Sequence, residues 1–448
     1  MKTAAELREK IAASSCDARK FIADFYDEGT FLESGTYIKN GADGEFEGVI
    51  TGCGAVDGRL VFAFIQDFSN GRAAFTAAHA KKICALYDKA MRAKAPVVAV
   101  LASAGAKLSE GIDAVSGYGA VIKKSNKAKN VIPQISVIAG ACGGILSALA
   151  SGFDFTVADE KNGELYVLPE SDESKRKGVK ADILCSKDEL AAKTAELISY
   201  IPSNSGDGTV CMLTEDDVNR PSDSVEAIVN TNGDAKELIS ALADNGAFYE
   251  LTADKAKELV TGFAFINDRC VGIVANQPTE NGGALTCGAA KKAARFIDFL
   301  GRFGVPVLTL VNTEGFGGKE CGCYSDAIAS MAAAYAGCES PKVTAVVGKA
   351  YGSAFTLMGS KELGADYVFA LDNAVISVMK PETAVEFVWD DKVKAASDPE
   401  AARAELKKEW ISVTASPLSA ARTGCIDDIV AYPELRQRIA AAFEILVG

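Results

Sequence analysis

Two glycine-containing turns are the segments of this chain whose residue types and spacing best suit chemistry. Residues 140–144 read GACGG and residues 348–352 read GKAYG, and helices are expected directly after them, over 145–151 and 353–358. The first N–H groups of a helix have no partner within the helix, and glycine lets a ligand oxygen approach them closely. The turns therefore predict a pair of oxyanion holes, each able to stabilise a developing anion by about 3 to 4 kcal/mol. Close packing of helix on strand, which also requires glycine, is the alternative explanation.

The chain offers few side chains for acid–base or metal chemistry. His79 is the single histidine; its neighbours are alanine and lysine, and the residue 210 positions later is Ala289, which favours a packing role over catalysis. The 12 cysteines are scattered, apart from Cys321 and Cys323, and form no CxxC pair. We therefore expect reduced thiols, no multi-histidine centre and no metal ligands.

An internal duplication positions the two turns. Residues 56–105 match residues 266–315 at an uninterrupted offset of 210, with 12 identities in 50 positions. The match continues with small slips: 132–146 resembles 340–355 at an offset of 208, and 154–158 resembles 366–370 at an offset of 212. A period this long indicates a duplicated domain rather than a solenoid. We expect domains over 1–230 and 231–448.

Each copy alternates apolar strand runs with an amphipathic helical run. In the first copy, Ile83, Leu86, Tyr87 and Ala90 recur at helical spacing between two apolar runs, which predicts a βαβ unit and an α/β fold. The polar stretch 170–235 is expected to hold a helix near 188–200 and a linker. From residue 401 on, we expect helices that pack on the second half or on another subunit.

Composition narrows the class of protein. A net charge of −13 argues against a nucleic-acid-binding surface, and the charged N-terminus lacks the apolar core of a signal peptide. Residues 131–153 carry no charge, but they contain a proline, four glycines and mostly small residues. We interpret this stretch as a buried strand, turn and helix, and we expect no direct membrane insertion.

Longer runs identify a family. The runs SAGAKLSEGIDAVSGYG, VIPQIS and GACGGI, followed by VGIVANQP, KKAARFIDF, KAYGSAF and SPLSAARTGCIDDIV, resemble in this order the carboxyltransferase (beta) subunits of biotin-dependent acyl-CoA carboxylases, such as propionyl-CoA carboxylase. The resemblance covers nearly the whole chain and implies a tandem duplication of two crotonase-like (ClpP/crotonase) domains, each a ββα superhelix. The chain departs from the family pattern at 71–74 (GRAA), 102–107 (ASAGAK) and 380–384 (KPETA).

The resemblance also implies roles for individual residues. The first turn would bind the thioester carbonyl through N–H groups near Gly144 and Ile145, and the second would hold the ureido oxygen of carboxybiotin at Gly352, Ser353 and Ala354. Further contacts with the acyl-CoA are expected at Gly105, Ala106, Lys107, Gly140, Gly143 and Thr356. Further contacts with biotin are expected at Gly315, Phe316, Tyr351 and Gly352. Lys123, Lys124, Lys127 and Lys129, placed on a loop before the first turn, could meet the CoA phosphates, unless they form a solvated face.

The implied reaction moves a carboxyl group between carboxybiotin and an acyl-CoA of the propionyl-CoA or acetyl-CoA class. Enolates held in the two oxyanion holes would carry it, so no side-chain base is required. An alternative is the soluble subunit of a biotin-dependent, sodium-pumping decarboxylase that acts on methylmalonyl-CoA or malonyl-CoA. A second alternative is a catalytically degenerate scaffold that binds acyl-CoA without turnover.

The resemblance further implies partner chains. Biotin would be carried on a separate biotin carboxyl carrier subunit and charged by a biotin carboxylase subunit. The chain itself would form a homo-oligomer, a dimer or a hexamer. No nucleic-acid partner is expected, and the cytoplasm is the expected location.

Overall fold

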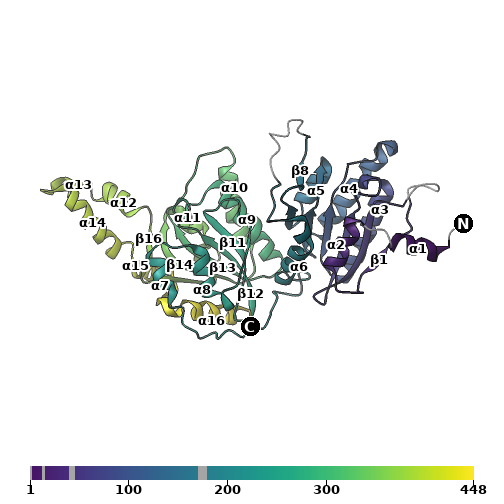
Figure 1. Cartoon of the computed structure of the whole chain (residues 1–448). Helices are drawn as coiled ribbons and strands as arrows, with labels where there is room; N and C mark the ends of the chain where they lie inside the picture. Colours follow the sequence, from purple (N-terminus) through teal and green to yellow (C-terminus); the bar gives the residue numbers. More distant parts are fainter. Residues whose placement is uncertain (1–2, 13–15, 40–45, 170–178, 448) are drawn as a thin grey trace. The chain divides into compact units, whose positions relative to one another are not determined.

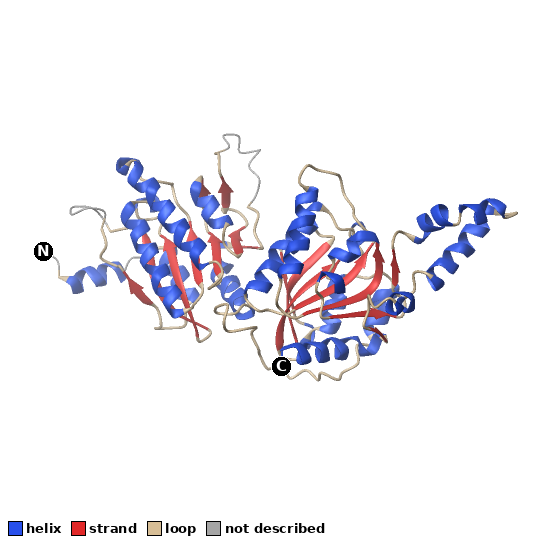
Figure 2. Ribbon diagram, turned by 180° about the vertical axis from the view of Figure 1, so that it is seen from behind, coloured by secondary structure: helices blue, strands red, loops and turns tan. Residues whose placement is uncertain are grey.

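Two compact units make up the molecule, Met1–Gly208 and Thr209–Gly448 (Figure 1). The computed structural model describes residues 3–12, 16–39, 46–169 and 179–447. Each unit is a sheet covered by helices on both faces, which agrees with the α/β units expected from the repeat (Figure 2). The division falls after residue 208, whereas the polar composition of residues 170–235 placed the expected boundary near residue 230.

The first unit contains a sheet in the order β1-β2-β3-β4-β5-β7-β9 and a small separate sheet of β6 and β8. Strands β1 to β3 are antiparallel, and from β3 onward the main sheet is parallel. The strands are β1 Leu32–Ser34, β2 Val49–Val56, β3 Arg59–Gln66, β4 Val97–Leu101, β5 Gln134–Ile138, β6 Ala141–Gly143, β7 Phe155–Asp159, β8 Glu164–Tyr166 and β9 Ile183–Cys185. The helices are α1 Ala4–Ala12, α2 Asp17–Phe25, α3 Ala77–Ala93, α4 Ile112–Ala128, α5 Ile145–Ser151 and α6 Leu190–Tyr200, with short 3₁₀ turns η1 Gly71–Ala73, η2 Leu108–Glu110 and η4 Lys187–Glu189.

The second unit repeats this arrangement in the order β10-β11-β12-β13-β14-β15-β17, with β16 paired to the end of β14. Its strands are β10 Phe248–Leu251, β11 Leu259–Ile266, β12 Arg269–Asn276, β13 Val307–Thr313, β14 Lys342–Tyr351, β15 Tyr367–Leu371, β16 Val375–Ser377 and β17 Asp428–Val430. Its helices are α7 Ser224–Asn230, α8 Ala235–Leu242, α9 Cys287–Arg302, α10 Tyr324–Gly337, α11 Gly352–Leu357, α12 Pro381–Val388, α13 Asp390–Ala395, α14 Pro399–Val413, α15 Pro417–Arg422 and α16 Leu435–Val447, with 3₁₀ turns η5 Asp244–Gly246, η6 Asn281–Gly283, η7 Lys361–Leu363 and η8 Tyr432–Glu434.

Strand pairing confirms the duplication. Val97 lies opposite Phe62 in the first sheet, and Val307 lies opposite Gly272 in the second, which is the offset of 210 on both strands. The helices that follow also begin alike, because the hydroxyl oxygens of Thr76 and Thr286 accept N–H bonds from the third residue after each. Such caps satisfy one of the free donors of a helix and stabilise it by about 1 kcal/mol. The two copies therefore share register and helix boundaries.

Both faces of each sheet are buried, which explains the continuous apolar strand runs. In the first unit, Phe64 and Ala99 pack on α3 and α4, while Ile65 and Val100 face α2 and α6 on the other side. In the second unit, α8 and α16 join strand residues such as Ile273 in one apolar cluster. The expectation that the tail packs on the second half is thus confirmed for α16.

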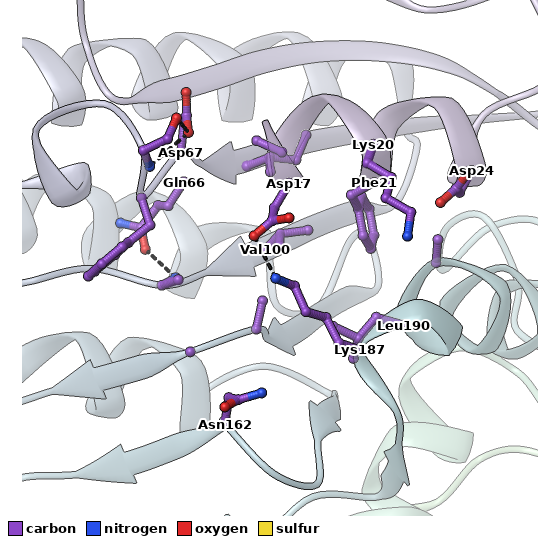
Figure 3. Close-up of a pocket in the computed structure, with 18 of the residues that line it drawn as sticks. Asp17, Lys20, Phe21, Asp24, Gln66, Asp67, Val100, Asn162, Lys187 and Leu190 are labelled. Carbon is purple, nitrogen blue, oxygen red and sulfur yellow. Dashed lines mark hydrogen bonds and ion pairs between the residues drawn. The ribbon is translucent and has the colours of Figure 1, made fainter. Parts of the chain in front are cut away.

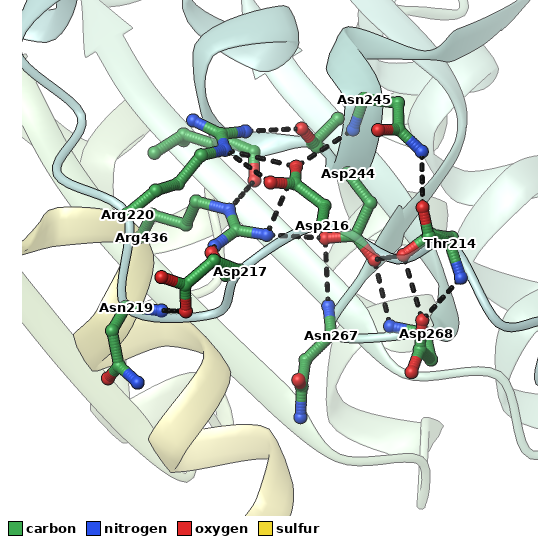
Figure 4. A network of polar contacts seen from close by, with 12 residues as sticks. Thr214, Asp216, Asp217, Asn219, Arg220, Asp244, Asn245, Asn267, Asp268 and Arg436 are labelled. Atoms are coloured by element: carbon green, nitrogen blue, oxygen red, sulfur yellow. Dashed lines mark hydrogen bonds and ion pairs between the residues drawn. The ribbon is translucent and has the colours of Figure 1, made fainter.

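A buried ion-pair network explains why the units divide before residue 209 rather than near 230 (Figure 4). Arg436 of α16 is fully buried, and its Nη2 lies 2.7 Å from Asp244 Oδ1 and 3.4 Å from Asp216 Oδ2. Arg220 Nε donates to Asp216 Oδ1 at 2.8 Å. A buried charge is strongly destabilised without its partner. The segment around Asp216 and Arg220 therefore belongs to the second unit, although its polar composition resembles a linker.

Other expectations about the chain's organisation are met in part. The charge-free stretch 131–153 forms β5, β6 and α5, and the helix expected near 188–200 is η4 with α6. Strand β9, which extends the first sheet, was not predicted within the polar stretch, and residues 170–178 of that stretch lie outside the described residues. Every helix in the described ranges is too short or too polar to span a membrane.

Candidate functional site

The first glycine turn is positioned by a strand that leaves the main sheet. After β5, the chain forms β6, which pairs in parallel with β8 and brings Gly143 opposite Tyr166. The expected helix, α5, then begins at Ile145. The turn is therefore not a simple loop from strand to helix, because Ala141–Gly143 forms a second, smaller sheet that holds it.

The backbone conformation at position 144 favours glycine, and the Gly144 N–H already donates a hydrogen bond within the protein. Its φ is 60°, a region that side chains disfavour, and a Cβ there would meet no atom within 4 Å. The Gly144 N–H donates to the Tyr166 carbonyl at 2.8 Å. Of the two N–H groups expected to bind the thioester, the candidate that remains is that of Ile145. Ile145 is the first residue of α5, so the helix has no preceding carbonyl that could accept from its N–H.

The second turn is built the same way. Strand β14 runs on to Tyr351, beyond its expected end at Gly348, because its last residues pair with β16. Gly352 then opens α11 with a φ of 63°, and a Cβ there would lie 3.4 Å from the Val378 carbonyl oxygen. Ser353 and Ala354, the other expected donors, follow within the first turn of this helix. Helix α11 thus begins one residue earlier than expected.

A second pair of glycines, Gly105 and Gly315, lies at equivalent positions in the two units. At each position the chain that follows a sheet strand passes beside the residues that precede α3 or α9. Gly105 has a φ of 95° and Gly315 a φ of 112°. The Gly105 carbonyl accepts from Phe75 N at 2.8 Å, and the Gly315 carbonyl accepts from Leu285 N at 2.9 Å. Ala106 and Phe316 consequently form single bridges to the residues that precede α3 and α9. Phe316, which was expected to contact biotin, is 49% exposed. Lys107, which was expected to contact the acyl-CoA, donates its backbone N–H to the Phe75 carbonyl at 2.8 Å.

Two side-chain amides that the sequence patterns did not indicate, Gln66 and Asn276, bind the backbone shortly before Gly105 and Gly315. The Gln66 Oε1 atom accepts from Ala102 N at 3.1 Å, and Asn276 Oδ1 accepts from Asn312 N at 3.2 Å. Asn312 Oδ1 in turn accepts from Lys349 N at 3.0 Å, just before the second turn. The offset of 210 pairs Gln66 with Asn276 in the sequence, and that pairing was the available signal.

Asn312 also explains a glycine. A Cβ on Gly348 would lie 2.6 Å from the Asn312 side chain, so only glycine fits beside this amide. The equivalent Gly140 is less crowded, since its Cβ would lie 3.1 Å from the Ala102 Cβ. The glycine that the sequence analysis read as the end of a strand is therefore a packing requirement in the second unit.

Glu314, also missed, connects three segments around the second turn. Its Oε1 lies 2.6 Å from Lys349 Nζ, and its Oε2 lies 2.7 Å from Lys380 Nζ. The hydrogen bonds from Lys349 and Lys380 lower the pKa of the Glu314 carboxyl below its usual value. Glu314 directly precedes Gly315, so this anion fixes the start of the segment expected to meet biotin.

The remaining expected residues differ in accessibility. Tyr351 is 8% exposed, and burial, with smaller contributions from Glu382 and Glu314, raises the pKa of its phenol to about 12. Thr356 is exposed on α11. Lys123, Lys124 and Lys127 lie on helix α4 and not on a loop, and Lys124 pairs with Asp88.

The first unit contains a cavity of about 460 Å³ between α2, the first residues of α6 and the carboxyl ends of β3 and β4 (Figure 3). Its lining includes Gly140, Gln66 and Asp67. An ion pair of 2.5 Å between Asp17 and Lys187 crosses it. A cavity of this size and mixed polarity suits part of a small organic ligand. Gly140 is the one residue expected to contact the acyl-CoA that appears in this lining.

His79 packs in the core, as expected. It is fully buried, its ring centroid lies 4.7 Å from that of Phe75, and its Nε2 lies 3.5 Å from Gln66 Nε2. Burial, together with the Lys82 ammonium, lowers the pKa of His79 to about 3. A neutral, enclosed imidazole cannot exchange protons with a bound substrate.

Sequence comparisons connect this geometry to known proteins. The family model described as the carboxyl transferase domain matches residues 17–169 and 174–447. The carboxyltransferase subunit of propionyl-CoA carboxylase from Haloferax mediterranei is 34% identical, over 96% of this chain and 90% of its own. The alpha subunit of methylmalonyl-CoA decarboxylase from Propionigenium modestum is also 34% identical, over 99% of this chain and 92% of its own.

Solved structures agree with the sequence relatives. A crystal structure of transcarboxylase 12S, described as a hexamer assembly with methylmalonyl-coenzyme A bound, superposes with a TM-score of 0.91 at 30% identity. The match covers 98% of this chain and 91% of that one. A single-chain, multi-domain long-chain acyl-CoA carboxylase shares the fold, with a TM-score of 0.77 at 21% identity.

Proposed function

The chain belongs to the carboxyl transferase family, and we propose that it moves a carboxyl group between carboxybiotin and an acyl-CoA of the propionyl-CoA or acetyl-CoA class. One observation carries the assignment of the site: Gly144 and Gly352 begin equivalent helices with φ values of 60° and 63°. Each turn presents backbone N–H groups in a conformation that only glycine readily adopts. The reaction forms negative charge on two oxygens, and the duplication provides one such turn for each.

The acyl-CoA is assigned to the first unit. The Ile145 N–H is the donor for the thioester oxygen, because the Gly144 N–H is committed to Tyr166. A fixed N–H of this kind lowers the energy of the enolate relative to the thioester, since the charge on the oxygen grows during proton removal. The open space beside Gly144 supports this assignment, because a ligand oxygen can approach without meeting a side chain.

The biotin group is assigned to the second unit. Carboxybiotin, carried by a separate subunit, supplies the activated carboxyl group. The N–H groups of Ser353 and Ala354 are positioned to hold its ureido oxygen, and Gly315 with Phe316 lines the approach. The exposed ring of Phe316 offers an apolar surface for the bicyclic ring, while Glu314 with its two lysines keeps the segment in place. The neutral, buried His79 is consistent with a reaction that needs no side-chain base.

A second candidate function is the reverse reaction. The chain is as similar to the alpha subunit of a methylmalonyl-CoA decarboxylase as to the carboxylase subunit, 34% identical in both cases, which supports decarboxylation of a malonyl-type CoA ester with transfer of the carboxyl group to biotin as the alternative. The site chemistry is the same in both directions, because both pass through the same enolates.

The exposed Thr356 on α11 is the proposed determinant of acyl chain length.

The proposed partners follow from the relatives. A biotin carboxyl carrier and a biotin carboxylase subunit would supply carboxybiotin, and the hexamer described for transcarboxylase 12S is the proposed assembly. The cytoplasm is the proposed location.

The decisive test combines the chain with free biotin and either malonyl-CoA or methylmalonyl-CoA. We expect decarboxylation of the CoA ester that depends on biotin, measured as loss of the substrate and release of CO₂. The matched reaction without biotin is the control. Binding of the CoA esters with no biotin-dependent turnover would support the scaffold hypothesis and overturn the proposed enzyme.

A further inference from the structure

Three cysteines from distant parts of the second unit form one cluster. Cys323 Sγ lies 3.5 Å from Cys287 Sγ and 3.5 Å from Cys321 Sγ, and all three sulfur atoms lie within 4.8 Å of one another. The three are free thiols, and Cys321 is exposed to solvent. The sequence showed only the close pair at 321 and 323, since Cys287 lies more than 30 residues away. We refer to Cys287, Cys321 and Cys323 as the thiol cluster.

Two long helices place these sulfur atoms at their amino-terminal ends. Cys287 is the first residue of α9, which is capped by Thr286, and Cys323 is the N-cap of α10. A helix N-terminus carries a partial positive charge that favours a thiolate over a thiol. The cluster therefore lies where two such termini converge: Cys287 is on α9, and Cys321 and Cys323 are at the end of the loop that connects β13 to α10.

A lysine adds a full positive charge. Lys291 lies one turn into α9, and its Nζ donates to Cys323 Sγ at 3.0 Å. This hydrogen bond lowers the pKa of the Cys323 thiol to about 7. Burial, with smaller contributions from the other two sulfur atoms, raises the pKa of Cys287 to about 11. The Lys291 ammonium thus lies within hydrogen-bond distance of the cluster, where a positive charge favours a thiolate.

We propose that the thiol cluster is a binding site for a thiophilic divalent cation of the zinc class, held by the sulfur atoms of Cys287, Cys321 and Cys323. Zinc bound to thiolates at about 2.3 Å in a tetrahedron separates the sulfur atoms by about 3.8 Å, close to the two separations of 3.5 Å from Cys323, and the third pair lies within 4.8 Å. Three thiolate ligands suit a soft or borderline cation rather than Mg²⁺ or Ca²⁺. On binding, each thiol that is still protonated releases its proton to the solvent, and water completes the coordination.

Hydrogen bonds and a ring contact connect the thiol cluster to Gly315–Gly317, the segment assigned to biotin. The hydroxyl of Tyr324, which follows Cys323, lies within hydrogen-bond distance of the Leu285 carbonyl and 2.9 Å from the Gly317 carbonyl, and Gly317 N donates to the Leu285 carbonyl at 3.1 Å. The Phe316 and Tyr324 ring centroids lie 6.3 Å apart. A bound cation would cross-link the start of α9 to this loop. The site would therefore order Gly315–Gly317 without contacting the reacting groups.

The test uses full-length, reduced and metal-free protein titrated with Co²⁺. We expect a saturable thiolate-to-cobalt charge-transfer absorption and the visible bands of tetrahedral cobalt at one equivalent, both displaced by one equivalent of Zn²⁺. Cys323→Ser and Cys287→Ser are expected to weaken binding at least tenfold. Cys211→Ser, which changes an exposed cysteine of the same unit outside the cluster, is the matched control and should bind like the parent protein.

A second measurement needs no variant. Zn²⁺ should protect Cys287, Cys321 and Cys323 of the parent protein from alkylation, as read by peptide mass spectrometry, while Cys211 stays reactive. Absence of the cobalt bands, equal binding by Cys323→Ser and the parent protein, or equal alkylation with and without Zn²⁺ would each overturn the proposal. The proposal would also be overturned if two cysteines of the cluster form a disulfide that resists the reducing treatment and prevents Co²⁺ binding.

Discussion

Gly144 and Gly352 have the same backbone conformation at the same place in two separately folded units. Their φ values are 60° and 63°; Gly144 caps α5 after β6, a strand of the small separate sheet, and Gly352 begins α11 after β14, whose last residues pair with β16. Because the positions match in structure and differ in flanking side chains, the two turns can be tested one at a time.

Gly352→Val is expected to lower biotin-dependent decarboxylation at least a hundredfold, because the side chain displaces the ureido oxygen from the N–H groups of α11. Binding of the CoA ester to the first unit should be unchanged. Gly144→Val should lower turnover to a similar extent and should act on the thioester instead. Steady-state rates and CoA-ester titrations would measure both effects.

The matched controls for these substitutions are Gly424→Val and Gly58→Val. Gly424 has a φ of 82° and Gly58 a φ of 73°, and a Cβ at either would meet no atom within 4 Å. The controls impose similar backbone strain, of about 1 to 2 kcal/mol, away from the two turns. If they lower turnover as much as the site variants do, strain rather than anion binding explains the loss.

Glu314→Gln tests whether the segment before Gly315 must be fixed. The variant removes the anion that pairs with Lys349 and Lys380, which are 34% and 50% exposed in their side chains. Stability should fall by no more than about 1 kcal/mol, because partly exposed ion pairs contribute little. Turnover with free biotin should fall several-fold, mainly through a higher KM for biotin. Glu409→Gln, which breaks a more exposed pair with Lys392, should leave both quantities unchanged.

His79 should make the protein less stable in acid. Its pKa in the folded protein, about 3, lies below the unfolded value of 6.5, so its contribution is complete above pH 6.5 and is lost as pH falls toward 3. The loss should reach about 1.4 kcal/mol per pH unit in this window. Denaturant unfolding at pH 7.5 and pH 5.5 should show a smaller loss for His79→Gln than for the parent protein.

Glu47 provides the control with the opposite sign. Burial raises the pKa of its carboxyl above 4.5, so its contribution is present below the unfolded pKa and is lost as pH rises through the folded one. Glu47→Gln should therefore steepen the acid destabilisation relative to the parent protein. Equal pH slopes for the two variants would contradict the roles given to both groups.

Lys292→Met should destabilise the second unit. Its Nζ donates to the carbonyl oxygens of Thr252, Lys255 and Leu259 at 2.9, 3.1 and 2.7 Å. Loss of the donor leaves these carbonyls short of a partner, which costs about 2 kcal/mol. Thermal unfolding would measure the shift. Lys257→Met, at an exposed position of the same unit, should leave the melting temperature near that of the parent protein.

The sequence predicted most of what is local or repeated. The duplication, the βαβ units and helix α5 follow from patterns that the two copies share, and strand register confirms them. The division after residue 208 differs from the boundary expected near 230, because Asp216 and Arg220 have the composition of a linker until the fold places Arg436 beside Asp216. Composition cannot show that a charge is buried.

The sequence by itself predicted the class of chemistry through its resemblance to carboxyltransferase subunits, and its duplication indicated two glycine turns at matching positions as the candidate anion-binding sites. Only the tertiary structure showed that the Gly144 N–H already has a partner, the carbonyl of Tyr166 on a strand of the small sheet. It also brought Cys287 beside Cys321 and Cys323. The physical reason is the same in both cases. Hydrogen bonds and ligand sets depend on distances in space, and residues far apart in the chain show those distances only after folding.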